Sequence, residues 1–202
     1  MKNILIIEVS PRGASSASRE ATNILSARLH NAFPGAKFTY RDLEKDKLPH
    51  LDDRTIKAIA SKNPVEAETN KESAALSDEL IAEFLQSDLV VIGTPMWNFG
   101  VPSSLKAWID LIVRPGKTFN YIEAGVLGLA TGKKAILVIA SGGVFSEGPW
   151  KPWDFVEPYL RQILKFIGIE DVQAVRVEGL NIPAIAGNSM PNARKAIDRL
   201  AL

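Results

Sequence analysis

Residues 4–18 read Ile-Leu-Ile-Ile-Glu-Val-Ser-Pro-Arg-Gly-Ala-Ser-Ser-Ala-Ser, and this junction sets the architecture. The apolar run Ile4–Val9 is typical of a strand buried on both faces. A hydroxyl-rich loop follows, and an amphipathic helix is predicted from about Arg19 to Phe33. The first N–H groups of a helix lack intrahelical partners and attract anions, so the junction predicts a phosphate site. The alternative is a serine-rich turn in which Ser18 only caps the helix.

The composition excludes several classes of function. The chain has 202 residues, 46% of them hydrophobic, a net charge of +1 and no cysteine. The length suits one domain, and the weak net charge favours neither nucleic acid nor a membrane surface as a partner. The two histidines, His30 and His50, lack a cluster of further ligands, so we expect no metal site. No segment is long enough to span a membrane or resembles a targeting signal, which predicts a cytoplasmic protein.

Five strand-like runs alternate with helical patterns. Helices are predicted at about 19–33, 73–86, 102–112, 155–167 and 191–200. Strands are predicted at 4–9, 37–42, 88–93, 134–140 and 172–177. This alternation predicts an α/β three-layer sandwich, with a five-stranded parallel sheet between two layers of helices. A phosphate loop after the first strand fits the strand order 2-1-3-4-5, the flavodoxin-like arrangement.

Residues 43–72 form the least regular part of the chain. They are rich in charge, are interrupted by Pro49 and Pro64, and suggest one short helix at Thr55–Ala60. We therefore expect an irregular insertion in a single domain spanning residues 1–202. Its length suggests a role of its own, either to cover a site or to form an oligomer contact.

Two further loops are expected at the carboxyl edge of the sheet, where ligands of such folds bind. Pro95-Met-Trp-Asn-Phe99 places three large side chains on a stiff loop and favours a wall for a flat aromatic ligand, the alternative being a cap on the core. Asn98 also tolerates unusual backbone angles. Ala140-Ser-Gly-Gly143 ends the fourth strand, and its glycines allow a ligand close to the backbone, although a simple turn would look the same.

Several catalytic motifs are absent from the sequence. No dinucleotide fingerprint follows the first strand, and Gly128–Lys134 enters a strand instead of leaving one, unlike a phosphate loop. No nucleophile elbow is present. We predict no catalytic side chain and expect a bound cofactor to carry the chemistry.

The chain resembles the FMN-dependent NADH-azoreductases, also called NADH:quinone oxidoreductases, over nearly its whole length. The motifs that carry the resemblance are Ser10-Pro-Arg…Ser16-Ala-Ser18, Pro95–Phe99, Val101-Pro-Ser…Leu105-Lys…Asp110, Arg114…Gly116-Lys-Thr-Phe…Tyr121, Gly132-Lys-Lys, Gly142-Gly143 and Glu157-Pro-Tyr-Leu…Gly168-Ile.

This resemblance implies an FMN-binding homodimer that passes reducing equivalents from NADH to quinones or azo compounds by a ping-pong cycle. By similarity, Ser10 and Ser16, Ala17 and Ser18 hold the FMN phosphate. Pro95 and Met96–Phe99 flank the isoalloxazine ring, and Ala140, Ser141, Gly142 and Gly143 meet its other edge. Phe119 and Tyr121 help to form the substrate pocket, and one arrangement has them reach it from the partner subunit. Arg12 is a candidate cation beside the phosphate, or simply a solvated loop residue.

Two positions depart from this family pattern. Trp97 stands where many members have Tyr, and Ser141 stands where many have Arg. The first change bears on substrate preference, and the second on the flavin potential and the NADH affinity. Two rival functions stay open. One is a flavodoxin-type electron carrier without turnover of its own, which would usually be acidic. The other is a cofactor-free interaction protein.

Overall fold

The computed structural model describes residues 1–60 and 63–202, and its core is a five-stranded parallel sheet of order β2-β1-β3-β6-β7. The strands are β1 (Asn3–Glu8), β2 (Lys37–Asp42), β3 (Leu89–Pro95), β6 (Lys134–Ala140) and β7 (Asp171–Val177). The predicted flavodoxin-like order is confirmed, with β2 at one edge as expected.

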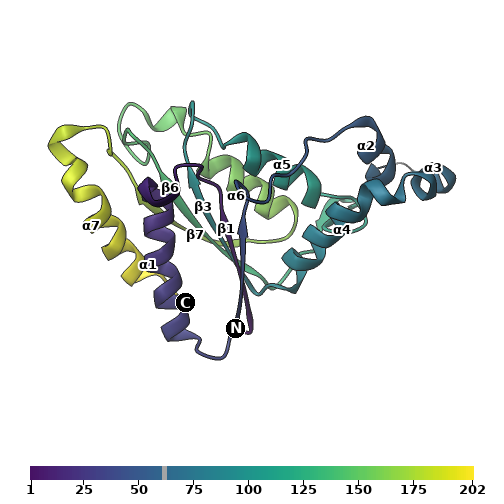
Figure 1. The fold of residues 1–202 in the computed structure, drawn as a ribbon, viewed down its shortest axis with the longest axis horizontal. Coiled ribbons are helices and arrows are strands. Elements are labelled where there is room, and N and C mark those ends of the chain that lie inside the picture. The colour runs from purple at the N-terminus through teal and green to yellow at the C-terminus, as the bar shows by residue number, and fades with distance from the viewer. Residues whose placement is uncertain (61–62) are drawn as a thin grey trace.

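Helices cover both faces of this sheet (Figure 1). One face carries α1 (Ala17–Ala32) and α7 (Pro183–Arg199), which pack on Ile4, Ile6, Val91 and Val138. The other carries α4 (Lys71–Gln86), α5 (Ser103–Ile112) and α6 (Glu157–Phe166). Because successive strand residues point to opposite faces, the almost wholly apolar strands supply both cores.

The segment 43–72 is more regular than predicted. It contains α2 (Asp53–Ala60) and α3 (Pro64–Thr69) and runs into α4, while residues 61–62 lie outside the described part of the chain. Figure 1 shows α2 and α3 at the end of the molecule farthest from α7. The short helix suggested at Thr55–Ala60 corresponds to α2, whereas the six-residue α3 was not predicted.

Two other elements differ from the prediction. The last helix begins at Pro183, not Pro191, because Pro183 takes the early helical position where a missing N–H costs nothing. Pro191 lies inside this helix on its exposed side. A hairpin of β4 (Phe119–Ile122) and β5 (Gly125–Gly128) was missed because its strands have four residues each and are mostly exposed.

Short 3-10 turns at η1 (Gly13–Ser15) and η2 (Lys151–Trp153) lie in the loops after β1 and β6. In the described part of the chain, no helix is long and apolar enough to cross a membrane.

Candidate functional site

The loop after β1 gathers three buried serine hydroxyls at the start of α1. The N-cap is Ser16, not Ser18, and its hydroxyl accepts a 3.3 Å hydrogen bond from the Arg19 N–H. The Ser18 hydroxyl is 3.0 Å from that of Ser16, and Ser10 is 1% exposed. Since Ser16 performs the capping, Ser18 is free to offer its hydroxyl to a ligand beside the first N–H groups of the helix.

Arg19 fixes this loop to the neighbouring strand. Its Nε donates to the Ser10 carbonyl at 2.8 Å, and its two terminal nitrogens bind the Asp42 carboxylate at 2.9 and 2.7 Å. The pair holds the pKa of Asp42 below its usual range, with the Arg19 hydrogen bond as the main cause. A two-pronged bond of this kind fixes geometry as well as charge, so the loop is preorganised.

The loop after β3 forms a tight turn. Trp97 and Gly100 exchange backbone hydrogen bonds of 3.0 and 2.9 Å, and the two central residues have positive φ, 46° at Asn98 and 67° at Phe99. This is the geometry of a type I′ turn, which Asn tolerates and Phe resists. The turn leaves the N–H groups of Asn98 and Phe99 outside its own hydrogen bonds.

The loop after β6 lies beside this turn. The Met96 N–H donates to the Ala140 carbonyl at 2.8 Å, and the Ser141 hydroxyl donates to the Gly143 carbonyl at 2.9 Å. A side chain at Gly142 would begin 2.4 Å from Nδ2 of Asn181. Gly142 is therefore required by close packing against the loop after β7.

These loops line one cavity of about 190 Å³ at the carboxyl edge of the sheet. Most of the predicted site residues lie on its wall. Its lining is Ser10, Arg12, Ser16, Ala17, Ser18, Pro95, Met96, Trp97, Ala140, Ser141, Gly142, Leu180 and Asn181. Sequence reasoning missed Leu180 and Asn181. Only their position in the sequence could have indicated them, because they follow the last strand of the sheet and so reach the same edge.

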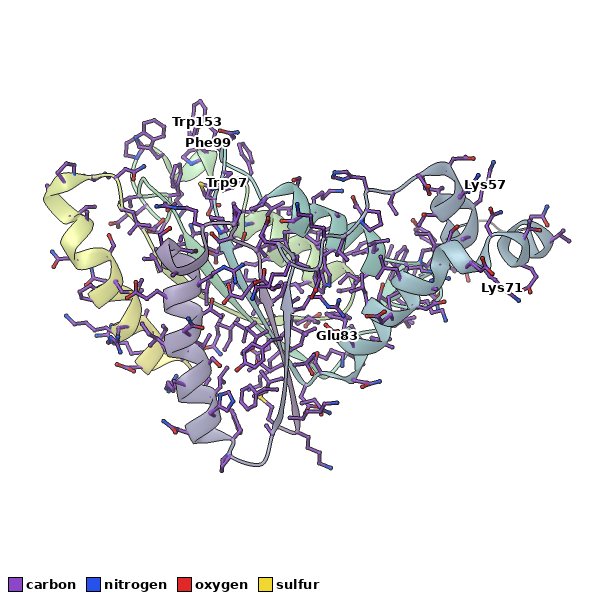
Figure 2. The ribbon with its side chains drawn as sticks, in the orientation of Figure 1. Lys57, Lys71, Glu83, Trp97, Phe99 and Trp153 are labelled. Carbon is purple, nitrogen blue, oxygen red and sulfur yellow. The ribbon has the colours of Figure 1, made fainter. Side chains whose placement is uncertain are left out.

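Asn98, Phe99 and Gly143 were predicted with this group but lie outside the wall of that cavity. Gly143 lines a larger adjoining cavity of about 800 Å³, which shares Gly142 and Asn181 with the first. Phe99 packs on Trp153, with ring centres 5.1 Å apart, and on Phe145 at 6.0 Å. Figure 2 shows Trp97, Phe99 and Trp153 together at one edge of the molecule.

An aromatic group adjoins the larger cavity and links two loops. Phe99, Phe145, Trp150 and Trp153 form a closed cycle of ring contacts, with centre-to-centre distances from 5.1 to 6.2 Å. The Phe155 N–H also donates to the Phe99 carbonyl at 3.1 Å. The strained turn is therefore supported from the loop after β6.

Arg176 on β7 anchors both ends of the loop after β6. Its guanidinium binds Asp154, Glu157 and Glu178. Glu178 in turn accepts the N–H groups of Phe145 and Ser146 at 2.8 and 2.9 Å. Asp154 accepts those of the two residues that begin α6, at 2.9 and 3.2 Å.

The predicted substrate residues Phe119 and Tyr121 lie elsewhere in this chain. They are on the β4–β5 hairpin, where Phe119 packs on Phe166 of α6 with ring centres 4.6 Å apart. Tyr121 is 75% exposed. Neither residue lines either cavity, so the single chain does not bring them to the predicted cofactor residues.

The chemistry of the small cavity suits an anion joined to a flat ring. Serine hydroxyls, helix N–H groups and the exposed Arg12 meet at one end. Met96 and Trp97 provide apolar surface at the other, and Trp97 is 47% exposed. Within residues 1–60 and 63–202, no three His, Asp or Glu side chains are grouped so as to hold a metal ion.

Comparison with known proteins gives a consistent result. A family profile described as flavodoxin-like fold matches residues 2–201. The chain is 61% identical to the FMN-dependent NADH:quinone oxidoreductase of Beijerinckia indica over 202 residues, which is 100% of both chains. It is 43% identical to FMN-dependent NADH:quinone oxidoreductase 1 of Rhizobium etli, covering 100% of this chain and 99% of that one.

Solved structures agree with these sequence matches. An azoreductase from Bacillus anthracis strain Sterne superimposes with a TM-score of 0.89 at 29% identity, covering 98% of each chain. An FMN-dependent NADH-azoreductase from Bacillus anthracis strain Ames Ancestor, solved in complex with FMN, gives a TM-score of 0.80 at 27% identity over 100% of each chain.

Proposed function

We propose, since the chain belongs to the family of FMN-dependent NADH:quinone oxidoreductases with a flavodoxin-like fold, that its small cavity binds FMN and that quinones or azo compounds are reduced beside it. The predicted family and the prediction of an enzyme are confirmed by these relatives. Which residues bind the cofactor, which donor and acceptor are used and in what order they react are our proposals.

The phosphate of FMN fits the loop after β1. Ser10, Ser16 and Ser18 present buried hydroxyls beside the start of α1, and Arg12 lines the same wall. The hydroxyls bind each other or nearby backbone, and hydrogen bonds to a doubly charged phosphate are stronger than these. This end of the cavity therefore matches the charged end of the cofactor.

The isoalloxazine ring fits the two other loops. Met96 and Trp97 offer apolar surface, while the N–H groups of Asn98 and Phe99 lie outside the hydrogen bonds of their own turn. The absence of a side chain at Gly142 keeps the backbone accessible. Bound FMN would supply hydride transfer, and backbone N–H donors fixed at the ring edge would stabilise the negative charge that reduction creates.

Donor and acceptor are expected to use this ring in turn. We propose that NADH reduces the protein and leaves, and that a quinone or azo compound then takes its place, which is a ping-pong cycle. The larger aromatic cavity next to Gly142 supplies apolar surface for a flat acceptor. Serine is uncharged, so position 141 brings no positive charge to the ring. The Ser141 hydroxyl donates to the Gly143 carbonyl. NADH as donor agrees with a cytoplasmic location.

A homodimer is the assembly that we propose. Tyr121, Ile122, Val126 and Leu127 on the β4–β5 hairpin are 43 to 75% exposed, a surface that is costly to leave in water. A second subunit that covers this hairpin would also allow Phe119 and Tyr121 to reach the partner's site. Sedimentation velocity at micromolar concentration tests this: a monomer at all concentrations would contradict it.

One observation carries the proposal: the loops after β1, β3 and β6 meet at a single cavity. The test is the absorption spectrum of the purified protein, followed by anaerobic addition of NADH and then of a quinone. We expect a flavin spectrum that NADH bleaches and the quinone restores, with parallel lines in double-reciprocal plots. A flavin-containing protein without steady NADH oxidation would be the electron carrier instead. A protein that never takes up FMN would refute the proposal.

A further inference from the structure

Glu8 is a buried carboxyl that the proposed function does not use. It is the last residue of β1, is 9% exposed, and its Oε2 has no hydrogen-bond partner in the described part of the chain. Oγ1 of Thr22 on α1 is likewise buried and without a partner. A side chain built at Gly93 would begin 2.3 Å from this Thr22 hydroxyl and 3.2 Å from Glu8 Oε2. The two orphaned groups therefore face the same spot on β3.

This pair lies directly beneath the loop Ser10–Ser18. Residues four apart on a helix share a face about 6 Å apart, which relates Thr22 to Ser18. Glu8 ends β1 and so immediately precedes this loop in the chain. Both Ser10 and Ser18 line the small cavity. Because Glu8 and Thr22 face the same spot at Gly93, the geometry of α1 places the Glu8 carboxyl roughly one helical turn below the phosphate end.

The charges around Glu8 leave it without a counterion of its own. Arg19 of α1 is engaged in the two-pronged bond with Asp42, which pairs with Glu8 in the β1–β2 register. Glu44 and Lys45 follow on the same side, where Lys45 is 83% exposed and 3.9 Å from Asp42. Gly93 of β3 brings no charge. Burial raises the pKa of Glu8 to about 7, Arg19 lowers it and Asp42 raises it.

We propose that the protonation state of Glu8 controls how tightly the loop Ser10–Ser18 binds the phosphate of FMN, an inference that rests on the function proposed above. A neutral Glu8 leaves the phosphate site free of opposing charge. An ionised Glu8 places a second anion roughly one helical turn beneath the phosphate, inside the protein. Repulsion over such a separation at an intermediate dielectric weakens binding roughly tenfold or more. Binding of FMN must therefore draw a proton from solvent onto Glu8 when the pH is above neutrality.

The experiment compares the FMN dissociation constant of the apoprotein with that of the Glu8→Gln variant from pH 6 to 9, by quenching of flavin fluorescence. Gln keeps the shape of the side chain and removes its charge. The ratio of wild-type to variant dissociation constants cancels the titration of the phosphate itself. We expect this ratio to rise about tenfold across the range. Riboflavin, which lacks the phosphate, serves as the matched ligand and should give a constant ratio.

Glu20→Gln is the matched control variant. Glu20 lies in the first turn of α1 but is exposed, so its charge is screened by water and the variant should follow the wild-type profile. A wild-type to Glu8→Gln ratio that stays flat for FMN would overturn the inference. So would equal slopes for FMN and riboflavin.

Proton uptake gives a second measurement that needs no variant. Titration calorimetry of the wild type with FMN at pH 8, in buffers with different ionisation enthalpies, should show uptake of roughly 0.4 of a proton for a tenfold coupling, and riboflavin should show none. Zero uptake with FMN would contradict the coupling. Binding of FMN with no pH coupling refutes this inference alone, whereas no FMN binding at any pH refutes the proposed function as well.

Discussion

The apoprotein should lose stability as the pH rises above 4.5, and Glu8→Gln should remove this loss. The pKa of Glu8 is about 7 in the folded protein against 4.5 for the free side chain, and burial is the main cause. Since folding favours the protonated form, the free energy of unfolding falls as the pH rises from 4.5 to 7 and stays lowered above that. The difference corresponds to about 3 kcal/mol at about 1.4 kcal/mol per pH unit.

Urea denaturation of the apoprotein at pH 5 and at pH 8.5 measures this effect. We expect the variant to gain about 2–3 kcal/mol over the wild type on going from the lower to the higher pH. Comparing the two pH values cancels the fixed cost of placing an amide at this buried position. Glu20→Gln, with an exposed carboxyl, should show no such gain. If wild type and Glu8→Gln lose stability in parallel, Glu8 ionises freely and the reasoning fails.

Three further variants test other parts of the structure. Replacing Ser10 and Ser18 together by Ala should weaken FMN binding by about 1–3 kcal/mol with riboflavin unaffected, and an unchanged FMN dissociation constant would move the phosphate elsewhere. Gly128→Ala should lower the free energy of unfolding by about 2–3 kcal/mol, because its Cβ would lie 2.2 Å from the Gly168 nitrogen; wild-type urea stability would disprove this packing. Arg176→Met should lower the free energy of unfolding by about 3–5 kcal/mol, because it leaves Asp154, Glu157 and Glu178 without their shared counterion; unchanged urea stability would show that this network does not stabilise the fold.

The sequence predicted the sheet well because its three central strands, β1, β3 and β6, are buried on both faces. The runs at Ile4–Val9 and Lys134–Ala140 are short, continuous and mostly apolar, which predicts buried strands. The alternation of strands with helices then limits the possible topologies. The three loops could be found for the same reason: each follows such a strand, so each reaches the same edge.

Other features left too weak a signal in the sequence. Within 43–72, the helix α2 was suggested by its pattern, but α3 has six residues, too few to show a clear helical period. Apart from the buried Phe119, the β4–β5 hairpin has its large apolar residues on the surface, opposite to the usual pattern of a buried strand. Leu180 and Asn181 have no motif of their own and enter the cavity only because β7 ends beside β6. The placement of Glu8 near Thr22 depends on Gly93, which no local sequence pattern connects to either residue.

Arg176 separates the loop after β6 into two fixed ends and a middle segment. The backbone between Ser146 and Asp154 is tethered at both ends by carboxylates that share one guanidinium, so its middle can accept new side chains while the sheet edge keeps its shape. Under the proposed function, exchange of residues 147–149, which line the larger cavity but lie outside the ring contacts of Trp150 and Trp153, offers a route to altered acceptor choice.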